Sequence, residues 1–158
     1  MNKFANAAVV ALALAGAVGM VAPASAEGEK PHVLVMGTPV KGGGADLAVD
    51  FYSDGSAIAV NVDLGVSNLA KSGAKTAGCD SLKLKASGNW QGGCSIVDGV
   101  IRFVAINLDM APLPAGWHSL GTVRVASLPK SGVEGKVVTA ANAKGEDISV
   151  GFKYSWVD

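Results

Sequence analysis

The sequence predicts an all-β protein, a sandwich of two sheets built from about eight short strands. Hydrophobic residues along most of the chain recur with a period of two, not 3.6. Gly, Pro and Asn interrupt these runs at short intervals, as turns between strands do. No stretch of ten or more residues carries an apolar stripe at helical spacing. Strands of this kind bury their apolar faces by packing one sheet on another.

The first 26 residues are expected to be a cleaved signal peptide. Lys3 supplies the positive charge, residues 5–21 form the apolar segment, and Ala24-Ser25-Ala26 is the small-x-small cleavage pattern. Residues 27–158 are long enough for one domain with a hydrophobic core, and no linker divides them. The expected location is therefore secreted or periplasmic.

Charge and hydropathy exclude two classes of partner. The chain contains 13 Lys and Arg against 13 Asp and Glu, and removal of Lys3 leaves a slight negative excess. Without a basic stripe to neutralise phosphates, nucleic acid is not an expected partner. No second apolar run reaches the roughly 18 residues that span a bilayer, so no membrane span is expected after the signal peptide.

Cys79 and Cys94 are the two cysteines of the chain. In an oxidising compartment an isolated pair is most simply one disulfide. A redox centre would place its cysteines two residues apart, and a zinc site would need more ligands. Closing a loop of this length is worth about 3 kcal/mol on the chain-entropy estimate.

The clearest strand is expected at residues 57–64, where Ile58, Val60, Val62 and Leu64 share one face. Residues 47–52 show the same alternation just before it. Since Asp54-Gly55 is a turn signal, the two runs are expected to be antiparallel neighbours.

Further strands are expected at 82–85, 122–126, 136–140 and 148–154. Residues 100–106 are more continuously apolar, which predicts a strand buried on both faces. Residues 32–36 are expected to open the domain as an edge strand.

This order of strands and turns, from about Val33 to Phe152, resembles a cohesin-type module of the wider carbohydrate-binding-domain superfamily. The matching features are the strand at 57–64, a following loop with Leu69, the Asp98-Gly99 turn into 100–105, the Pro/Gly loop 112–116 before 120–125, and the hairpin 137–148. The resemblance implies a two-sheet antiparallel jelly-roll sandwich of nine strands and a binding role. In the best-known cohesins, one sheet face docks a dockerin module.

Catalytic, cofactor and metal motifs are absent from the sequence, so an enzyme is not expected. His32 and His118 lie far apart, and no Gly-x-Ser-x-Gly elbow frames a serine. Asp46, Asp50 and Asp54 recur every four residues, which on a strand separates them by about 13 Å. A calcium ion held by Glu146 and Asp147 with Asp98 or Asp109 is the open alternative to turn-forming carboxylates.

The aromatic residues are the candidate ligand contacts. Trp90 and Trp117 lie in Gly-rich segments expected to be loops, where an indole is readily exposed. Phe152, Tyr154 and Trp156 alternate and should share one strand face, either as a sugar-stacking platform or as the closing strand of the core.

We therefore expect an exported, non-catalytic binding module. In the first hypothesis it binds an extracellular or periplasmic protein through a contiguous apolar patch on a sheet, near residues 57–63 and 100–106. In the second it binds a polysaccharide through Trp90, Trp117 and Trp156, with two aromatic rings coplanar on one surface. A hydrolase would instead need His118 beside a serine and an acid.

Overall fold

The computed structural model describes residues 28–66, 77–79, 88–126 and 132–157. The predicted signal peptide, Leu69 and the strand expected at 82–85 lie outside these residues. Ten strands form the described part of the chain: β1 (His32–Pro39), β2 (Ala45–Ser53), β3 (Ala57–Val66), β4 (Ala77–Cys79), β5 (Trp90–Val97), β6 (Val100–Asn107), β7 (Gly116–Val125), β8 (Val133–Asn142), β9 (Asp147–Ile148) and β10 (Gly151–Trp156).

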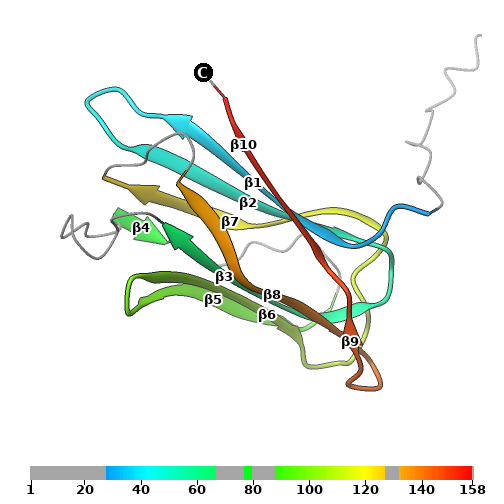
Figure 1. Cartoon of the computed structure of the whole chain (residues 1–158). Helices are drawn as coiled ribbons and strands as arrows, with labels where there is room; N and C mark the ends of the chain where they lie inside the picture. The colour runs from blue at the N-terminus through cyan, green and yellow to red at the C-terminus, as the bar shows by residue number, and fades with distance from the viewer. Residues whose placement is uncertain (1–27, 67–76, 80–87, 127–131, 158) are drawn as a thin grey trace, which may run out of the picture.

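The strands form two five-stranded sheets that pack face to face (Figure 1). Sheet A has the order β10-β1-β2-β7-β4, and sheet B the order β5-β6-β3-β8-β9. All pairings are antiparallel except that of β1 with β10, which is parallel. The predicted two-sheet, antiparallel sandwich is thus confirmed.

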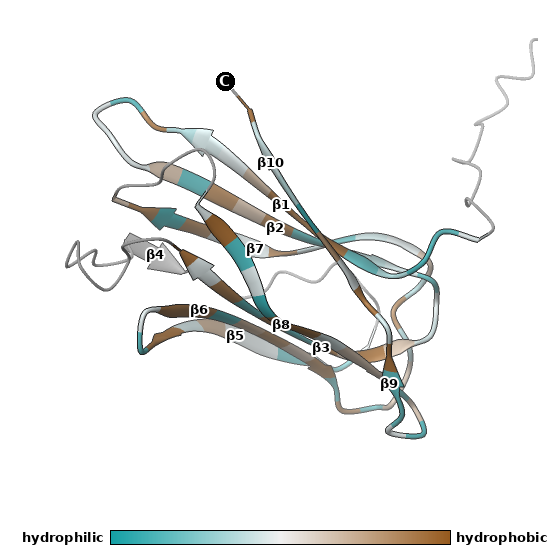
Figure 2. Ribbon diagram, in the orientation of Figure 1, coloured by the Kyte–Doolittle hydropathy of each residue, from teal (hydrophilic) through white to brown (hydrophobic). Residues whose placement is uncertain are grey.

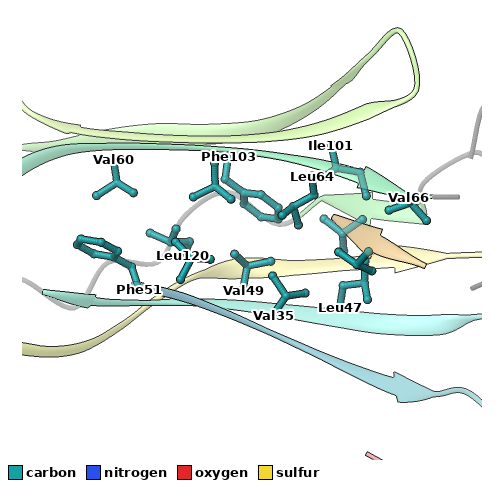
Figure 3. Close-up of a cluster of buried hydrophobic side chains, with 14 of the residues drawn as sticks. Val35, Leu47, Val49, Phe51, Val60, Leu64, Val66, Ile101, Phe103 and Leu120 are labelled. Carbon is teal, nitrogen blue, oxygen red and sulfur yellow. The ribbon is translucent and has the colours of Figure 1, made fainter. Parts of the chain in front are cut away.

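The hydrophobic core lies between the sheets. Phe51, Leu47 and Val49 of β2 point toward Leu64 of β3 and Phe103 of β6, and all are at most 1% exposed (Figure 3). These side chains sit at alternate positions of their strands, as the period-two pattern predicts. Residues away from the core are more polar: Figure 2 shows that the turn between β8 and β9 is largely hydrophilic.

The expected pairing of the second and third strands is wrong. β2 lies in sheet A and β3 in sheet B, so the Asp54-Gly55 turn carries the chain from one sheet to the other. Gly55 has a positive φ of 96°, and Asp54 Oδ1 accepts a hydrogen bond from the Ser56 backbone N–H. Two alternating runs joined by a short turn look alike in sequence whether the turn stays within a sheet or crosses between sheets.

The expected edge position of the first strand and the expected single strand at 148–154 are also wrong. β1 is not an edge strand, because β10 pairs beside it as the outer strand. The single strand expected at 148–154 is divided at Ser149 and Val150, so that β9 belongs to sheet B and β10 to sheet A. Where β10 crosses β8, an added Cβ at Gly135 would lie 2.9 Å from the Phe152 ring, so the crossing requires a glycine.

The strand at 100–106 is not buried on both faces. In β6, Ile101, Phe103 and Ala105 face the core, whereas Arg102, Val104 and Ile106 are exposed. The sheet leaves the second face of β6 uncovered, so its apolar residues on that side remain at the surface. β5 was missed as a strand because Gly92 and Gly93 interrupt its pattern.

Candidate functional site: the outer face of sheet B

An exposed apolar surface covers the three central strands of sheet B. Val104 and Ile106 of β6 are 38% and 40% exposed, and Val137 of β8 is 42% exposed. The strand register places Asn61 of β3 between Val104 and Thr139, and Ala59 between Ile106 and Ala141. We call this surface the docking face; it comprises Ala59, Asn61, Val104, Ile106, Val137, Thr139 and Ala141.

Small residues leave the docking face open. Gly93 of β5 lies opposite Val104, and an added Cβ at Gly93 would meet no atom within 4 Å. Because the neighbouring strand presents no side chain there, Val104 stays uncovered. A shallow hollow runs over Ala59 between β6 and β8, with Asp147 at its rim.

Two ion pairs lie beside the docking face. Arg102 Nε and Nη2 donate to Asp63 Oδ1 and Oδ2 at 2.8 and 2.6 Å. Asp63 is only 4% exposed, and its hydrogen bonds raise the pKa of the Arg102 guanidinium. Near the start of β8, Lys136 Nζ lies 2.6 Å from Glu134 Oε2 and holds the pKa of that carboxyl below its usual range.

The three tryptophans lie on strands, so the expected loop positions of Trp90 and Trp117 are wrong. Trp117 is the second residue of β7 and is 51% exposed. Trp90 begins β5 and Trp156 ends β10; both are half-buried and pack against the core. The turn residues around Trp90 and Trp117 gave no sign that a strand begins there.

The C-terminal aromatics share one face, as predicted, and that face points inward. Phe152, Tyr154 and Trp156 pair with Val33, Val35 and Gly37 of β1 and pack against the core. An added Cβ at Gly37 would lie 2.8 Å from the Trp156 ring. Of the two alternatives for this strand, the structure therefore gives the closing strand of the core.

Both histidines and several of the acidic residues have local partners. His118 Nε2 lies 2.7 Å from the Pro114 carbonyl oxygen, and His32 Nδ1 lies 3.0 Å from the Lys30 carbonyl oxygen. Asp46 binds Arg124, and Asp109 accepts a hydrogen bond from the Asn89 backbone N–H. Across the described ranges, no group of three His, Cys, Asp or Glu side chains could hold a metal ion.

The two cysteines lie on facing edge strands. Cys79 ends β4 at the edge of sheet A, and Cys94 lies in β5 at the edge of sheet B, where it packs against the core. β4 and β5 contact each other across the sandwich. The described part of the chain also holds no helix long and apolar enough to cross a bilayer.

A scan of the sequence against protein-family models gives no match, and neither does a search of curated proteins. Solved structures do match. A non-cellulosomal cohesin from the hyperthermophilic archaeon Archaeoglobus fulgidus has a TM-score of 0.53 at 16% identity, over 82% of this chain and 93% of that one. The second type II cohesin module of the cellulosomal adaptor ScaA scaffoldin of Acetivibrio cellulolyticus has a TM-score of 0.51 at 12% identity, over 80% and 94%.

A third similar structure is a chain of a type II Cohesin-X-Dockerin complex from Acetivibrio cellulolyticus. Its TM-score is 0.50 at 14% identity, over 80% of this chain and 96% of that one. These three likenesses show the fold: the chain is a cohesin-type β-sandwich, as its order of strands and turns predicts.

Proposed function

We propose that the protein is a non-catalytic binding module that docks a protein partner on the outer face of sheet B. The observation that carries this proposal is the exposure of Val104 and Ile106 on β6 and of Val137 on β8, the two strands that flank the half-buried Ala59 and Asn61 of β3. An exposed apolar surface on a regular sheet is typical of a protein–protein contact. The two strands expected from the sequence to form the contact, β3 and β6, are two of the three strands of this face.

The surface also indicates the chemistry of the partner. Arg102 and Lys136 are paired with carboxylates of this chain, so the docking face offers an apolar centre with the amide of Asn61 and the hydroxyl of Thr139. It therefore suits a partner surface that is apolar and uncharged at its centre, with hydrogen-bonding groups opposite Asn61 and Thr139. One similar solved structure is a cohesin in complex with an X-dockerin, which agrees with docking by this fold.

Export and a disulfide complete the proposal. Residues 1–26 have the pattern of a signal peptide, which would place the binding module in the periplasm or outside the cell. Cys94 is not a free thiol. Since Cys79 is the other cysteine of the chain, we propose a Cys79–Cys94 disulfide that joins the β4 and β5 edges of the sandwich.

The test is capture of extracellular proteins by the tagged chain, with Val104→Asp and Val137→Asp as docking-face variants. Thr122→Asp is the matched control, because Thr122 is exposed on the outer face of sheet A. We expect the wild type and the control to retain the same protein and both docking-face variants to lose it. Thermal unfolding of each variant checks that it is folded. Retention that the docking-face variants leave unchanged, or no retained protein at all, would contradict the proposal.

A further inference from the structure

The outer face of sheet A carries a cluster of three aromatic rings that the docking face does not use. His32 of β1, Tyr52 of β2 and Trp117 of β7 lie in register on neighbouring strands. The His32 and Tyr52 rings stack at 5.5 Å, and the Trp117 ring meets them edge-on, at 5.0 Å and 87° to His32 and at 5.4 Å and 69° to Tyr52.

The cluster holds one exposed indole in a fixed position. His32 and Tyr52 are only 6% and 7% exposed, whereas Trp117 is 51% exposed. Both contacts come from strands inside the sheet, so the indole is supported by rigid backbone. A ligand that stacks on Trp117 would therefore meet a ring that is already ordered, which lowers the entropic cost of binding.

A half-buried carboxylate lies one row away on the same face. Asp50 of β2 is opposite Ser119 of β7; Asp50 precedes Tyr52 by two residues, and Ser119 follows Trp117 by two. The rows are thus about 6.6 Å apart. The Ser119 hydroxyl donates a hydrogen bond to Asp50, while burial of the carboxylate raises its pKa.

Few neighbouring groups are placed to pair with the half-buried Asp50 carboxylate. Leu34 is its neighbour on β1, and Lys153 is the next residue across the sheet, on β10. Arg124, further along the same face, is bound to Asp46. A carboxylate has about four acceptor sites, so Asp50 can accept further hydrogen bonds from a ligand that carries hydroxyl groups.

We propose that Trp117, Asp50 and Ser119 form a binding site for a sugar ring of a polysaccharide. A pyranose has an apolar face of C–H groups, which packs on an indole, and a rim of hydroxyl groups, which donate to a carboxylate. Trp117 and Asp50 are diagonal neighbours on two adjacent strands, close enough for a single sugar ring to make both contacts. A protein partner is less suited, because Trp117 is the one exposed large hydrophobic side chain within the described strands of sheet A.

This site is independent of the docking face, because the two surfaces lie on opposite sides of the sandwich. The same molecule can therefore hold a glycan on sheet A while sheet B stays free for a protein. Such an arrangement would tether the docked protein to a polysaccharide.

The test is electrophoresis of the intact protein through native gels that contain soluble β-glucan, xylan, galactomannan or pectin. We expect at least one polysaccharide to retard the wild type and Val104→Asp equally. Trp117→Ala should weaken this retardation about tenfold or more, and Trp117→Phe less, because a phenyl ring still stacks. Asp50→Asn should also weaken it, with no loss of thermal stability.

The outcomes separate the alternatives. Absence of retardation by every polysaccharide, or retardation that Trp117→Ala leaves unchanged, would overturn the proposal. Loss of a captured protein in Trp117→Ala, without an effect on any polysaccharide, would show instead that this face binds protein. Because Val104→Asp leaves sheet A intact, failure of the docking proposal would not alter the sugar-binding result.

Discussion

Arg102 and Asp63 face each other across β6 and β3 and are joined by two hydrogen bonds of 2.8 and 2.6 Å. The carboxylate is 4% exposed although it lies on the outer face of sheet B, because the guanidinium covers it. Arg124 and Asp46 form the same two-bond pair on sheet A, but there the carboxylate side chain is 34% exposed. The two pairs share their chemistry and differ in the burial of the acid.

This difference predicts unequal effects of removing the arginine. Arg102→Ala leaves Asp63 without its guanidinium partner, so we expect a clear fall in the thermal midpoint. Arg124→Ala should change the midpoint little, since water can solvate Asp46. Thermal unfolding followed by circular dichroism measures both. Equal effects of the two substitutions would contradict the assigned burial of Asp63.

The inner faces of the two sheets should carry most of the stability. Phe103→Ala removes a ring that is 1% exposed in the core, and we expect the free energy of unfolding to fall by about 3–5 kcal/mol. Ile106→Ala, three residues along the same strand but on its exposed face, should cost less than about 1 kcal/mol. Urea denaturation compares them. A larger loss for Ile106 would mean that the docking face is covered within the molecule.

Tyr154 offers a substitution that should stabilise the protein. Its ring packs on the core above Gly37, and its hydroxyl is buried with no hydrogen-bond partner among the described residues. Tyr154→Phe removes this unsatisfied group while the ring remains, so the free energy of unfolding should rise by about 1 kcal/mol. Urea denaturation at neutral pH tests this. A fall in stability would show that the hydroxyl has a partner.

Asp50 should make stability depend on pH in a defined direction. Burial raises its pKa in the folded protein above the ordinary value of 3.8, so folding favours the protonated acid. The wild type therefore loses stability relative to Asp50→Asn as the pH rises through the folded pKa, and the difference closes below pH 3.8. Unfolding of both proteins at pH 3 and pH 7 measures it. A variant less stable than the wild type at pH 7 would contradict this assignment.

The proposed disulfide predicts a loss of stability on reduction. Cys94→Ser opens the loop between Cys79 and Cys94, and on the chain-entropy estimate the free energy of unfolding should fall by about 3 kcal/mol. Reductant should destabilise the wild type by a similar amount and leave the variant unchanged. Mass spectrometry of the alkylated protein counts free thiols directly. Two free thiols in the exported protein would remove the proposed bond.

The strand pattern made the fold and part of the docking face predictable. Alternation along residues 57–64 identified the inward residues of β3, and the apolar residues 100–106 indicated a strand with more hydrophobic surface than one core face requires. The local sequence pattern did not reveal that Val137 belongs to the docking face, because its place opposite Asp63 depends on the β3–β8 register. The same limitation applies to Asp50, whose burial is set by strands distant in sequence.

Local sequence by itself determined where strands and turns form, because side-chain alternation and turn conformations depend on adjacent residues. Only the tertiary structure decided which sheet each strand joins: Asp54-Gly55 moves the chain between sheets, and β10 leaves β9 to pair beside β1. That choice turned Trp90 and Trp156 toward the core and left Trp117 exposed. The physical reason is that the exposure of a side chain is set by what packs on each face of its strand, and those partners come from far along the chain.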